Sequence, residues 1–403
     1  MESVLILDGQ LKSALCAVRS LGHVGVPVVV GAERETGMAL HSRYVTGKFV
    51  YPSPLKGQHA FVDAVKGEAI RIGGKPIVYA FSDATVLALY SHRIDLCEYM
   101  TLVFPEDKSV EIAFDKSATY SLARVSGIPT ITTYVPEREE EVLHLAPTLT
   151  YPVVMKTRRS VTWRGDGVGI FGTAIFIHSE TELIQKFKEI KESVGESPIV
   201  QNIVFGEEYG VEMIAHKGKP SGVVTHHRIR SLSPTGGAAV LKEVLDEGDL
   251  RNSLETYAKA LVSKLKWSGP IMVEFKVDSD SRVPYLMEIN GRFWGSLPLS
   301  VASGVDIPYL YYEYAKSGRI PQGIFTPREG TVTRHFLGDV RHLLRVFFSR
   351  DKMRAYLYPK RMTALRNFFS LPPDTKSDVW SWSDPKPAFF EFFDILNKYF
   401  HTK

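Results

Sequence analysis

The chain is poor in cysteine, with only Cys16 and Cys97 among its 403 residues. Their spacing matches no common metal-binding pattern, and two cysteines are too few for a fold held together by disulfides. Both lie in segments with the apolar periodicity of helices, so we expect buried free thiols in a reducing compartment.

Long apolar runs are also missing, since no stretch approaches the ~20 residues that a helix needs to cross a bilayer. The first residues, MESVLILDG, lack a basic leader segment and pass directly into an apolar strand pattern. We therefore expect no signal peptide, and the expected location is cytoplasmic.

The charge balance excludes a further class of protein. The formal net charge is +4, from 49 Lys and Arg against 45 Asp and Glu, without the dense basic stripe of a nucleic-acid binder. A mild positive charge suits anionic small-molecule substrates. Extensive disorder is not expected at 44% hydrophobic residues, and the length predicts two or three domains.

The N-terminal region alternates strand and helix patterns, which predicts βαβ units and a parallel sheet. A dinucleotide site needs the glycine pattern GxGxxG after the first strand. This chain has Asp8, Gly9 and Gln10 there instead. A dinucleotide site is therefore not expected there. The predicted elements are strands at residues 3–7, 27–30 and 77–81 and helices at residues 11–21 and 84–94, with Ser82 and Asp83 as loop and cap.

The middle of the chain predicts two further regions, the first beginning near Phe114 with Asp115 as a helix N-cap. From about Arg319 onward the chain becomes rich in proline, aromatic and basic residues. Between these points we predict helices at residues 115–126, 180–193 and 250–267, strands at residues 151–157, 199–204, 211–216 and 222–230, and a hairpin at residues 271–292.

The hairpin carries the strongest chemical signal. Its first strand contains Glu274, and its second strand has Glu288, Asn290 and Arg292 at alternate positions. Side chains two apart on a strand share a face, so these groups should point the same way. Two carboxylates and a carboxamide form an oxygen-ligand site for Mg²⁺, and the guanidinium beside them suits a phosphate.

The alternative for the hairpin is a solvated strand face that carries two acids by chance. Met287, Ile289 and Phe293 favour the first interpretation, because they indicate that the opposite face belongs to the core. Burying this much charge without a ligand would be unfavourable.

A glycine-rich stretch with Gly165, Gly167, Gly169 and Gly172 follows the strand that ends near Lys156. Glycines let the backbone approach a ligand closely, so successive N–H groups can converge on phosphate oxygens. An ordinary hairpin turn explains the same pattern equally well. Lys116, taken alone, is weaker still, since most lysines are solvated.

His226, Arg228 and Arg230 alternate along the strand predicted at residues 222–230 and should share one face. That face could bind a carboxylate substrate or a transferred phosphoryl group, and a solvent-exposed basic strand is the equal alternative. A zinc site is not expected, because the histidines have no further clustered ligands.

The order of these elements resembles the ATP-grasp superfamily. A βαβ domain is followed by Asp115 and Lys116, by Lys156, by the glycine-rich stretch, by GEE at residues 206–208, and by VEFK and MEINGR. The resemblance covers roughly residues 1–320 and is strongest at MEINGRFWGS. It is closest to the carbamoyl-phosphate-synthase-like ATP-dependent carboligases, also called carboxylate–amine ligases.

The resemblance implies a role for each matching residue. The implied nucleotide contacts are Lys116 and Lys156 for the phosphates, Gly165, Gly167 and Gly169 for a closing flap, Gln201, Asn202, Ile203 and Val204 for the adenine-reading hinge, and Glu208 for the ribose. The implied metal ligands are Glu274, Glu288 and Asn290, for two Mg²⁺ ions or for Mn²⁺ in their place. Arg292, with Lys156, is implied to stabilise the transferring phosphoryl group. Arg228 and Arg230 are our candidates for binding the acid substrate.

Two residues depart from the family pattern. Gln201 stands where glutamate is common in the hinge, although its carbonyl oxygen can still accept a hydrogen bond from an adenine amine. Gly291 stands where many families have proline. The change leaves the metal ligands in place but makes the assignment to one of the better-known branches of the family less specific.

The implied fold is α/β (α+β), with an N-terminal βαβ domain, a two-lobed ATP-grasp fold and a helical, aromatic C-terminal extension. We place a Rossmann-like pre-ATP-grasp domain at residues 1–112, the small lid subdomain at residues 113–203, the large subdomain at residues 204–320, and the extension at residues 321–403.

The implied reaction is ATP- and Mg²⁺-dependent ligation of a carboxylate to an amine through an acyl phosphate. The alternatives are a carboxylase-like enzyme that uses bicarbonate and a non-catalytic nucleotide sensor on the same fold. The complete metal set argues against the sensor, and no biotin-carrier segment is seen in the sequence. Expected partners are a small acid and an amine but no nucleic acid, with a homodimer as a further expectation.

The C-terminal tail mixes aromatic and basic residues, as in RVFFSRDKMRAYLYPKRM. This composition fits peripheral contact with a membrane or a protein partner. The alternative, which we favour, is that residues 389–400 form an amphipathic helix that covers the core of the ligase.

Overall fold

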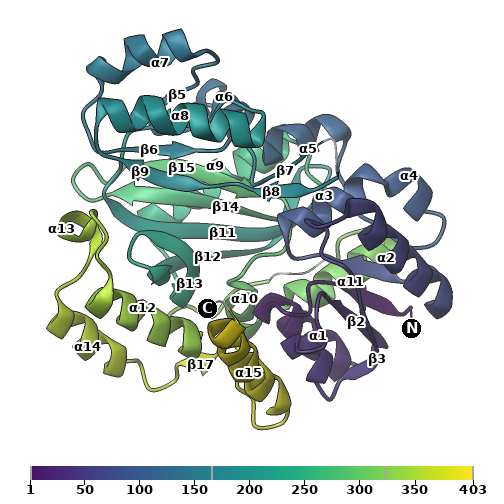
Figure 1. Cartoon of the computed structure of the whole chain (residues 1–403). Coiled ribbons are helices and arrows are strands. Elements are labelled where there is room, and N and C mark those ends of the chain that lie inside the picture. Colours follow the sequence, from purple (N-terminus) through teal and green to yellow (C-terminus); the bar gives the residue numbers. More distant parts are fainter. Residues whose placement is uncertain (1, 165–166, 322, 324, 402–403) are drawn as a thin grey trace.

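The computed structural model describes residues 2–401 except 165–166, 322 and 324. Figure 1 shows an N-terminal unit beside two lobes that face each other, with the C-terminal helices along the lower edge. The described residues form a mixed α/β structure with a parallel four-stranded sheet, an antiparallel four-stranded sheet, a seven-stranded sheet and a two-stranded hairpin.

The N-terminal unit is built on a parallel sheet with strand order β3-β2-β1-β4. Strands β1, β2 and β4 are buried along their whole length, as expected for parallel strands covered by helices on both faces. The predicted cap is confirmed, since the Ser82 hydroxyl accepts a hydrogen bond from the Thr85 N–H. The elements are β1 (Val4–Ile6), α1 (Lys12–His23), β2 (Val28–Ala32), η1 (Met38–His41), β3 (Val45–Val50), α2 (Gln58–Ile72), β4 (Ile77–Tyr79), α3 (Asp83–Ser91) and α4 (Arg93–Leu96).

Asp8 explains why this unit lacks a dinucleotide fingerprint. Its buried carboxylate accepts hydrogen bonds from the N–H groups of Phe81, at 2.8 Å, and Ser82, at 3.0 Å. The Thr85 hydroxyl donates a third, at 2.7 Å. The end of the first strand is therefore tied to the strand-to-helix turn after β4, in the position where a glycine loop would receive a ligand.

The small lobe is an antiparallel sheet with strand order β5-β10-β6-β9, and the hairpin β7–β8 extends from it. The side chains of Leu183, Phe187 and Ile190 on α8 are buried in the lobe's core, since their spacing puts them on one helix face. The elements are β5 (Thr133–Tyr134), α7 (Glu139–Leu145), η2 (Ala146–Thr148), β6 (Val153–Lys156), β7 (Val161–Trp163), β8 (Gly169–Phe171), β9 (Ala174–Ile177), α8 (Glu180–Val194) and β10 (Ile199–Gln201).

The large lobe holds the seven-stranded sheet, with strand order β15-β14-β11-β12-β13-β16-β17. Helix α6 begins as predicted, because Asp115 caps it by accepting from the N–H groups of Ser117 and Ala118. The elements are α5 (Asp107–Phe114), α6 (Lys116–Val125), β11 (Gly206–His216), β12 (Lys219–Ser233), β13 (Gly236–Val244), α9 (Asp249–Lys264), β14 (Gly269–Asp278), β15 (Pro284–Asn290), α10 (Leu297–Ala302), α11 (Ile307–Ser317) and β16 (Val332–Arg334).

The division into domains at residues 112, 203 and 320 stays a prediction. The C-terminal extension folds back on the rest of the chain. Its last helix lies between α12 and the N-terminal unit (Figure 1), where the Phe390 ring stacks on His41 at 3.2 Å between centroids. The helix that we favoured at residues 389–400 thus forms, as part of α15, and Ala388 just before it packs against the core. Phe389, Phe392 and Phe393 are about half exposed, so the covering of the core by this helix stays a prediction. The elements are α12 (Phe336–Phe348), α13 (Arg354–Leu357), α14 (Arg361–Phe369), β17 (Lys376–Ser377) and α15 (Lys386–His401).

One prediction about the cysteines is wrong. Cys16 is a buried free thiol, whereas Cys97 is exposed, because it follows the short helix α4 at the surface of the N-terminal unit. Among the described residues, no helix is long and apolar enough to cross a membrane.

Asp378 joins three parts of the chain. One of its carboxylate oxygens accepts from the ammonium groups of Lys12 in α1 and Lys242 in β13. Asp378 and Lys242 are both buried. Burial lowers the pKa of Lys242 to about 7, although Asp378 opposes this shift. Burial also opposes the charge on Asp378, but Lys12 and Lys242 outweigh it and hold the pKa of that carboxyl below its usual range.

We predict that Asp378→Asn destabilises the chain by about 3–5 kcal/mol, because it leaves buried lysines without a counter-charge. Urea unfolding followed by circular dichroism measures the change. The control is Asp374→Asn, at an exposed position of the same extension. Equal unfolding midpoints for the two variants would contradict the role of Asp378.

Candidate functional site

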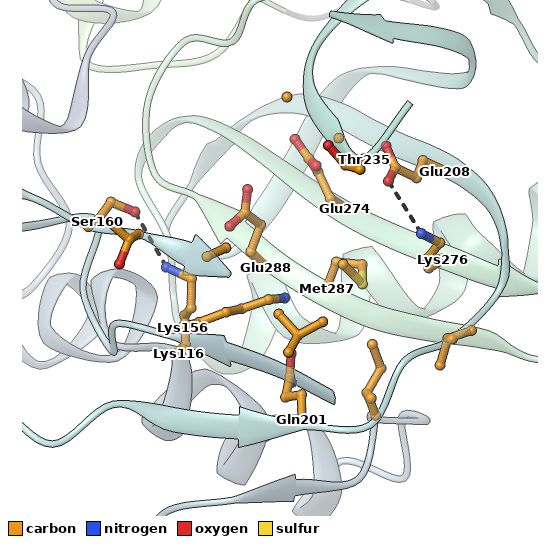
Figure 2. Close-up of a pocket in the computed structure, with 18 of the residues that line it drawn as sticks. Lys116, Lys156, Ser160, Gln201, Glu208, Thr235, Glu274, Lys276, Met287 and Glu288 are labelled. Carbon is orange, nitrogen blue, oxygen red and sulfur yellow. Dashed lines mark hydrogen bonds and ion pairs between the residues drawn. The ribbon is translucent and has the colours of Figure 1, made fainter. Parts of the chain in front are cut away.

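A cavity of about 510 Å³ lies between the small-lobe sheet and the seven-stranded sheet of the large lobe. It collects side chains from β6, β11, β12, β14 and β15, and from the N-terminal unit through Asp83. Figure 2 shows Lys116 and Lys156 on one side of the cavity and Glu208 and Glu274 on the other. The large-lobe side is mixed in charge, because it also contributes Arg228, Lys276 and Arg292.

The carboxylates on the hairpin come together as the sequence predicts. Glu274 on β14 and Glu288 on β15 are direct cross-strand partners, and both line the cavity. The Asn290 amide donates to Glu274 at 3.2 Å. Burial raises the pKa of Glu274 to about 7, with Glu288 and Glu208 adding to the shift and Arg228 opposing it. The cost of burying this carboxylate is thus only partly offset by the guanidinium of Arg228.

The prediction that Met287 faces the core is wrong, because Met287 lines the cavity (Figure 2). Its neighbours explain the difference. Glu274 pairs with Glu288 while Phe275 pairs with Leu286, so Met287 is an extra residue in a β-bulge. A bulge breaks the alternation of side chains, and Met287 therefore joins Glu288 on the cavity side.

Arg292 lies just beyond the end of β15 and is held by three oxygen atoms. Its guanidinium donates to the Asp83 carboxylate at 2.7 Å, the Asn290 side-chain oxygen at 3.0 Å and the Phe293 carbonyl at 2.9 Å. Asp83 is the first residue of α3, so the N-terminal unit positions a cation inside the cavity. The sequence offered Asp83 only as part of a helix cap.

Lys116 and Lys156 both line the cavity, as predicted. Lys116 is the first residue of α6, and its ammonium lies 3.5 Å from the Ser160 hydroxyl. Lys156 ends β6 and points into the cavity (Figure 2). Burial lowers the pKa of Lys156 to about 8; Glu288 opposes this shift, and Lys116 adds to it. Both cations are thus placed to receive an anionic group.

The glycine-rich stretch contributes less than predicted. Gly165 lies outside the described residues, and Gly167 and Gly169 do not line the cavity. Gly169 instead donates its N–H to the Leu55 carbonyl at 2.8 Å, so hairpin β7–β8 is docked on the N-terminal unit. Gly172 does line the cavity, and a Cβ there would lie 2.4 Å from the Thr157 hydroxyl.

The predicted hinge residues Gln201, Asn202, Ile203 and Val204 all line one end of the cavity. Gln201 is buried, and its amide nitrogen donates to the Thr133 hydroxyl at 2.8 Å. Its side-chain oxygen is buried and has no hydrogen-bond partner within the part of the chain that the structure describes. A buried acceptor of this kind is poised for a donor from a ligand.

Glu208 and Arg228 connect this end to the carboxylate corner. Arg228 bridges two acids, with 2.9 Å from its guanidinium to Glu208 and 2.9 Å to Glu274. Lys276 lies 3.5 Å from the other oxygen of Glu208. Burial opposes ionisation of Glu208, but Arg228 and Lys276 outweigh it and keep the pKa of Glu208 below its usual value.

Arg230 is not where the sequence predicts, since it does not line the cavity. Its guanidinium makes two hydrogen bonds of 2.8 Å to Asp339 on α12. Along β12 the register shifts between His227, which pairs with Glu243, and Arg230, which pairs with Leu241. This bulge ends the alternation that would place Arg230 beside Arg228.

His226 is also withdrawn from the cavity. It is completely buried, and its ring lies 3.1 Å from the Glu212 carboxylate, which the hydroxyls of Ser296 and Ser300 also contact. The histidine therefore belongs to a buried polar network under the sheet rather than to the ligand-facing surface.

The C-terminal extension supplies a cavity residue that no sequence signal indicates. Leu357 at the end of α13 lines the cavity, and the preceding Tyr356 stacks on Phe205 at 6.1 Å between centroids. This contact joins segments about 150 residues apart, so local patterns cannot show it. Leu357 places an apolar wall near the hinge end.

Gly291 has a packing reason to lack a side chain. A Cβ there would lie 2.5 Å from the Trp267 ring and 3.1 Å from the Phe114 ring. Trp267 is buried in the large-lobe core. Proline, which also carries a Cβ, would clash in the same way, and this accounts for the departure from the family pattern.

The donor set at the carboxylate corner fits a hard divalent cation. Glu274, Glu288 and Asn290 offer only oxygen ligands, and the raised pKa of Glu274 marks a place where added positive charge would be favourable. No group of three or more His, Cys, Asp or Glu suited to a metal occurs among the described residues. The corner has two carboxylates and a carboxamide, so a magnesium-type site would be completed by other oxygen atoms, such as those of a phosphate.

Known sequences share part of this arrangement. Residues 196–335 match the model of the family described as "ATP-grasp in the biosynthetic pathway with Ter operon". Over 223 residues the chain is 26% identical to the carbamoyl phosphate synthase large chain of Pyrococcus furiosus. That alignment covers 54% of this chain but 20% of the relative, so the chain spans about a fifth of that relative's length.

Solved structures share the fold over most of the chain. The biotin carboxylase domain of Hydrogenobacter thermophilus 2-oxoglutarate carboxylase, in complex with MgADP, ADP and bicarbonate, gives a TM-score of 0.63 at 16% identity, over 82% of this chain and 73% of that one. The L-amino acid ligase of Bacillus licheniformis gives 0.58 at 17% identity, over 79% and 74%. At these identities the likeness establishes the fold alone.

Proposed function

Because the chain is an ATP-grasp protein by its fold and by the family match over residues 196–335, we propose that it is an ATP-dependent ligase that joins a carboxylate to an amine. The resemblance predicted from the sequence is thereby confirmed at the level of the superfamily. The observation that carries the proposal is the cavity, which brings Lys116 and Lys156 together with Glu274, Glu288 and Asn290.

The geometry supports a nucleotide lying along the cavity. We assign the unpaired oxygen of Gln201 to an adenine amine and Glu208 to the ribose hydroxyls, since both residues line the cavity. We assign Lys116 and Lys156 to the phosphates, since both lysines line the same cavity. The structurally similar biotin carboxylase domain is described in complex with MgADP, which supports this assignment.

Mg²⁺ would be held by Glu274, Glu288 and Asn290 and, when bound, would neutralise charge on the phosphates. Arg292 supplies a fixed cation beside these ligands, because Asp83 and Asn290 orient its guanidinium. Lys156 supplies a second cation from the opposite lobe. Groups held in position before the reaction stabilise developing charge without further reorganisation.

We propose a reaction in two steps. A carboxylate oxygen of the acid substrate attacks the γ-phosphorus of ATP, the bond to the β,γ-bridging oxygen breaks, and ADP leaves. The amine nitrogen then attacks the carbonyl carbon of the acyl phosphate, phosphate leaves with the bonding electrons, and the nitrogen loses a proton. Phosphoryl transfer depends mainly on positioning and charge neutralisation, which this cavity offers.

Bicarbonate is the alternative acid, since the biotin carboxylase relative is described with bicarbonate bound. The same phosphorylation step would then give carboxyphosphate. A screen for phosphate release over amino acids, small acids and amines, each with and without added bicarbonate, distinguishes the two reactions. Phosphate release that follows bicarbonate rather than an organic acid would replace the first proposal with the second.

We predict that Glu288→Gln lowers substrate-dependent phosphate release by about 10²-fold or more, because a charged ligand at the centre of the site is lost. The change keeps the side chain's shape, so circular dichroism should remain unchanged. The matched control is Glu247→Gln at an exposed position outside the cavity. Full activity in Glu288→Gln would rule out the metal assignment.

From the lowered pKa of Lys156 we predict that nucleotide binding depends on pH. Its pKa of about 8 in the free protein should rise when a phosphate binds, so binding above pH 8 requires uptake of a proton. ADP affinity should therefore fall as pH rises through 8, by up to about tenfold per pH unit. Lys156→Arg, which stays charged, should flatten the profile measured by calorimetry, and Lys219→Arg at the surface should not. Identical profiles for all three proteins would exclude Lys156 as a phosphate contact.

We predict that Leu357→Ala weakens ADP binding several-fold, roughly 1–2 kcal/mol, because apolar contact at the hinge end is lost. Leu357→Asp should weaken it further by placing a charge against the base. Leu143→Ala on α7 serves as the control, since that leucine is exposed and remote from the cavity. Unchanged ADP affinity in both Leu357 variants would show that α13 does not contact the bound nucleotide.

A further inference from the structure

Helix α12 is oriented with its polar face inward and its apolar face outward. Gly338, Asp339, His342 and Val346 are its buried residues. They follow one side of the helix, because residues three and four apart are neighbours on a helical surface. Only one of these four carries a sizeable apolar side chain. An ordinary surface helix buries its apolar face instead.

Specific hydrogen bonds fix this orientation. Asp339 accepts from both Arg230 and Arg334, at 2.8 Å and 2.7 Å. A ring nitrogen of His342 lies 2.7 Å from the Ser231 carbonyl on β12, and Arg345 donates to the Leu232 carbonyl at 3.2 Å. Rotating the helix to bury its apolar side would break all of these contacts.

The outward stripe of α12 consists of Phe336, Leu344 and Phe348, with the half-buried Val340 between the first two. Phe336 is 54% exposed, Leu344 49% and Phe348 76%. On the neighbouring helix α14, Met362 and Phe369 are 72% and 76% exposed. Large apolar side chains gathered on adjacent exposed helices usually mark a surface that is covered in function.

The charge of this segment indicates what covers it. Residues 336–370 contain eight Lys or Arg against two Asp, and one of these acids, Asp339, is buried against Arg230 and Arg334. Arg341, Arg350 and Arg366 are among the exposed cations, and they alternate along the chain with the exposed aromatic residues. An apolar stripe with basic residues beside it complements a bilayer with anionic headgroups.

We propose that the basic–apolar arm, defined as residues 336–370, docks the protein on an anionic phospholipid surface. The stripe of α12 inserts between headgroups, and the arginines beside it bind lipid phosphates. A second copy of the chain is a poorer occupant, because two such arms would bring like charges together. Nucleic acid would use the cations but leave Leu344, Phe348 and Met362 without an apolar partner.

Vesicle flotation of the full-length chain tests the proposal. We expect binding to vesicles of phosphatidylcholine mixed with phosphatidylglycerol, weaker binding to phosphatidylcholine alone, and loss of binding as salt is raised. Each cation near an anionic surface contributes about 1 kcal/mol, so Arg341→Glu with Arg350→Glu should lower vesicle binding at least tenfold. The charge-matched control, Arg138→Glu with Lys188→Glu, changes two exposed cations of the small lobe and should bind as the unchanged chain does.

The apolar part is tested by Leu344→Ser with Phe348→Ser, which should lower binding at least as strongly without changing circular dichroism. Ile94→Ser is the control, because Ile94 is 84% exposed and lies on α4 of the N-terminal unit, outside the arm. Failure of the unchanged chain to bind anionic vesicles would overturn the proposal. So would equal binding by the stripe variant, a concentration-dependent dimer that the stripe variant abolishes, or tighter retention on single-stranded RNA than on vesicles.

Discussion

The cavity depends on one row of polar side chains in which acids and cations alternate, with one neutral amide between them. It runs from Lys276 through Glu208, Arg228 and Glu274 to Asn290, Arg292 and finally Asp83, each side chain in contact with the next. The row begins on the large-lobe sheet and ends on the N-terminal unit, so it joins the two parts through the site itself. Buried charges are tolerated only when they are paired, and each member therefore depends on its neighbours for stability. The contacts that keep these buried charges paired therefore also fix the positions of the groups that we assign to ligand binding.

Strand β12 links this row to the rest of the molecule. Arg228 faces the cavity, whereas Arg230, two residues later, binds Asp339 on the C-terminal extension. The bulge between His227 and Arg230 separates the two roles. The same extension returns to the cavity at Leu357 and is held to the N-terminal unit through Asp378 and Lys12. The segment after residue 320, which the sequence predicts as a separate extension, thus contacts both the cavity and the N-terminal unit.

The sequence predicted the elements and much of the cavity because their signals are local. Caps such as Asp115 and the alternation of Glu288 and Asn290 depend on neighbours a few residues away. The failures occur where alternation breaks, at the bulges that turn Met287 inward and Arg230 away. Asp83 and Leu357 were missed for another reason. Their position at the cavity arises from the packing of distant segments, and no local pattern encodes such packing.

Arg228 gives the row a further property. In the structure its guanidinium supplies the positive charge that Glu208 and Glu274 require. If Mg²⁺ and a nucleotide bind as proposed, they compete with Arg228 for the same two acids, since each carboxylate has few free lone pairs. Releasing Arg228 would leave a cation that must find another anion in a buried place. The carboxylate of an acid substrate is such an anion. Charge balance would therefore favour binding of the acid substrate after the nucleotide. Arg228 would then exchange the carboxylates of Glu208 and Glu274 for the carboxylate of the substrate.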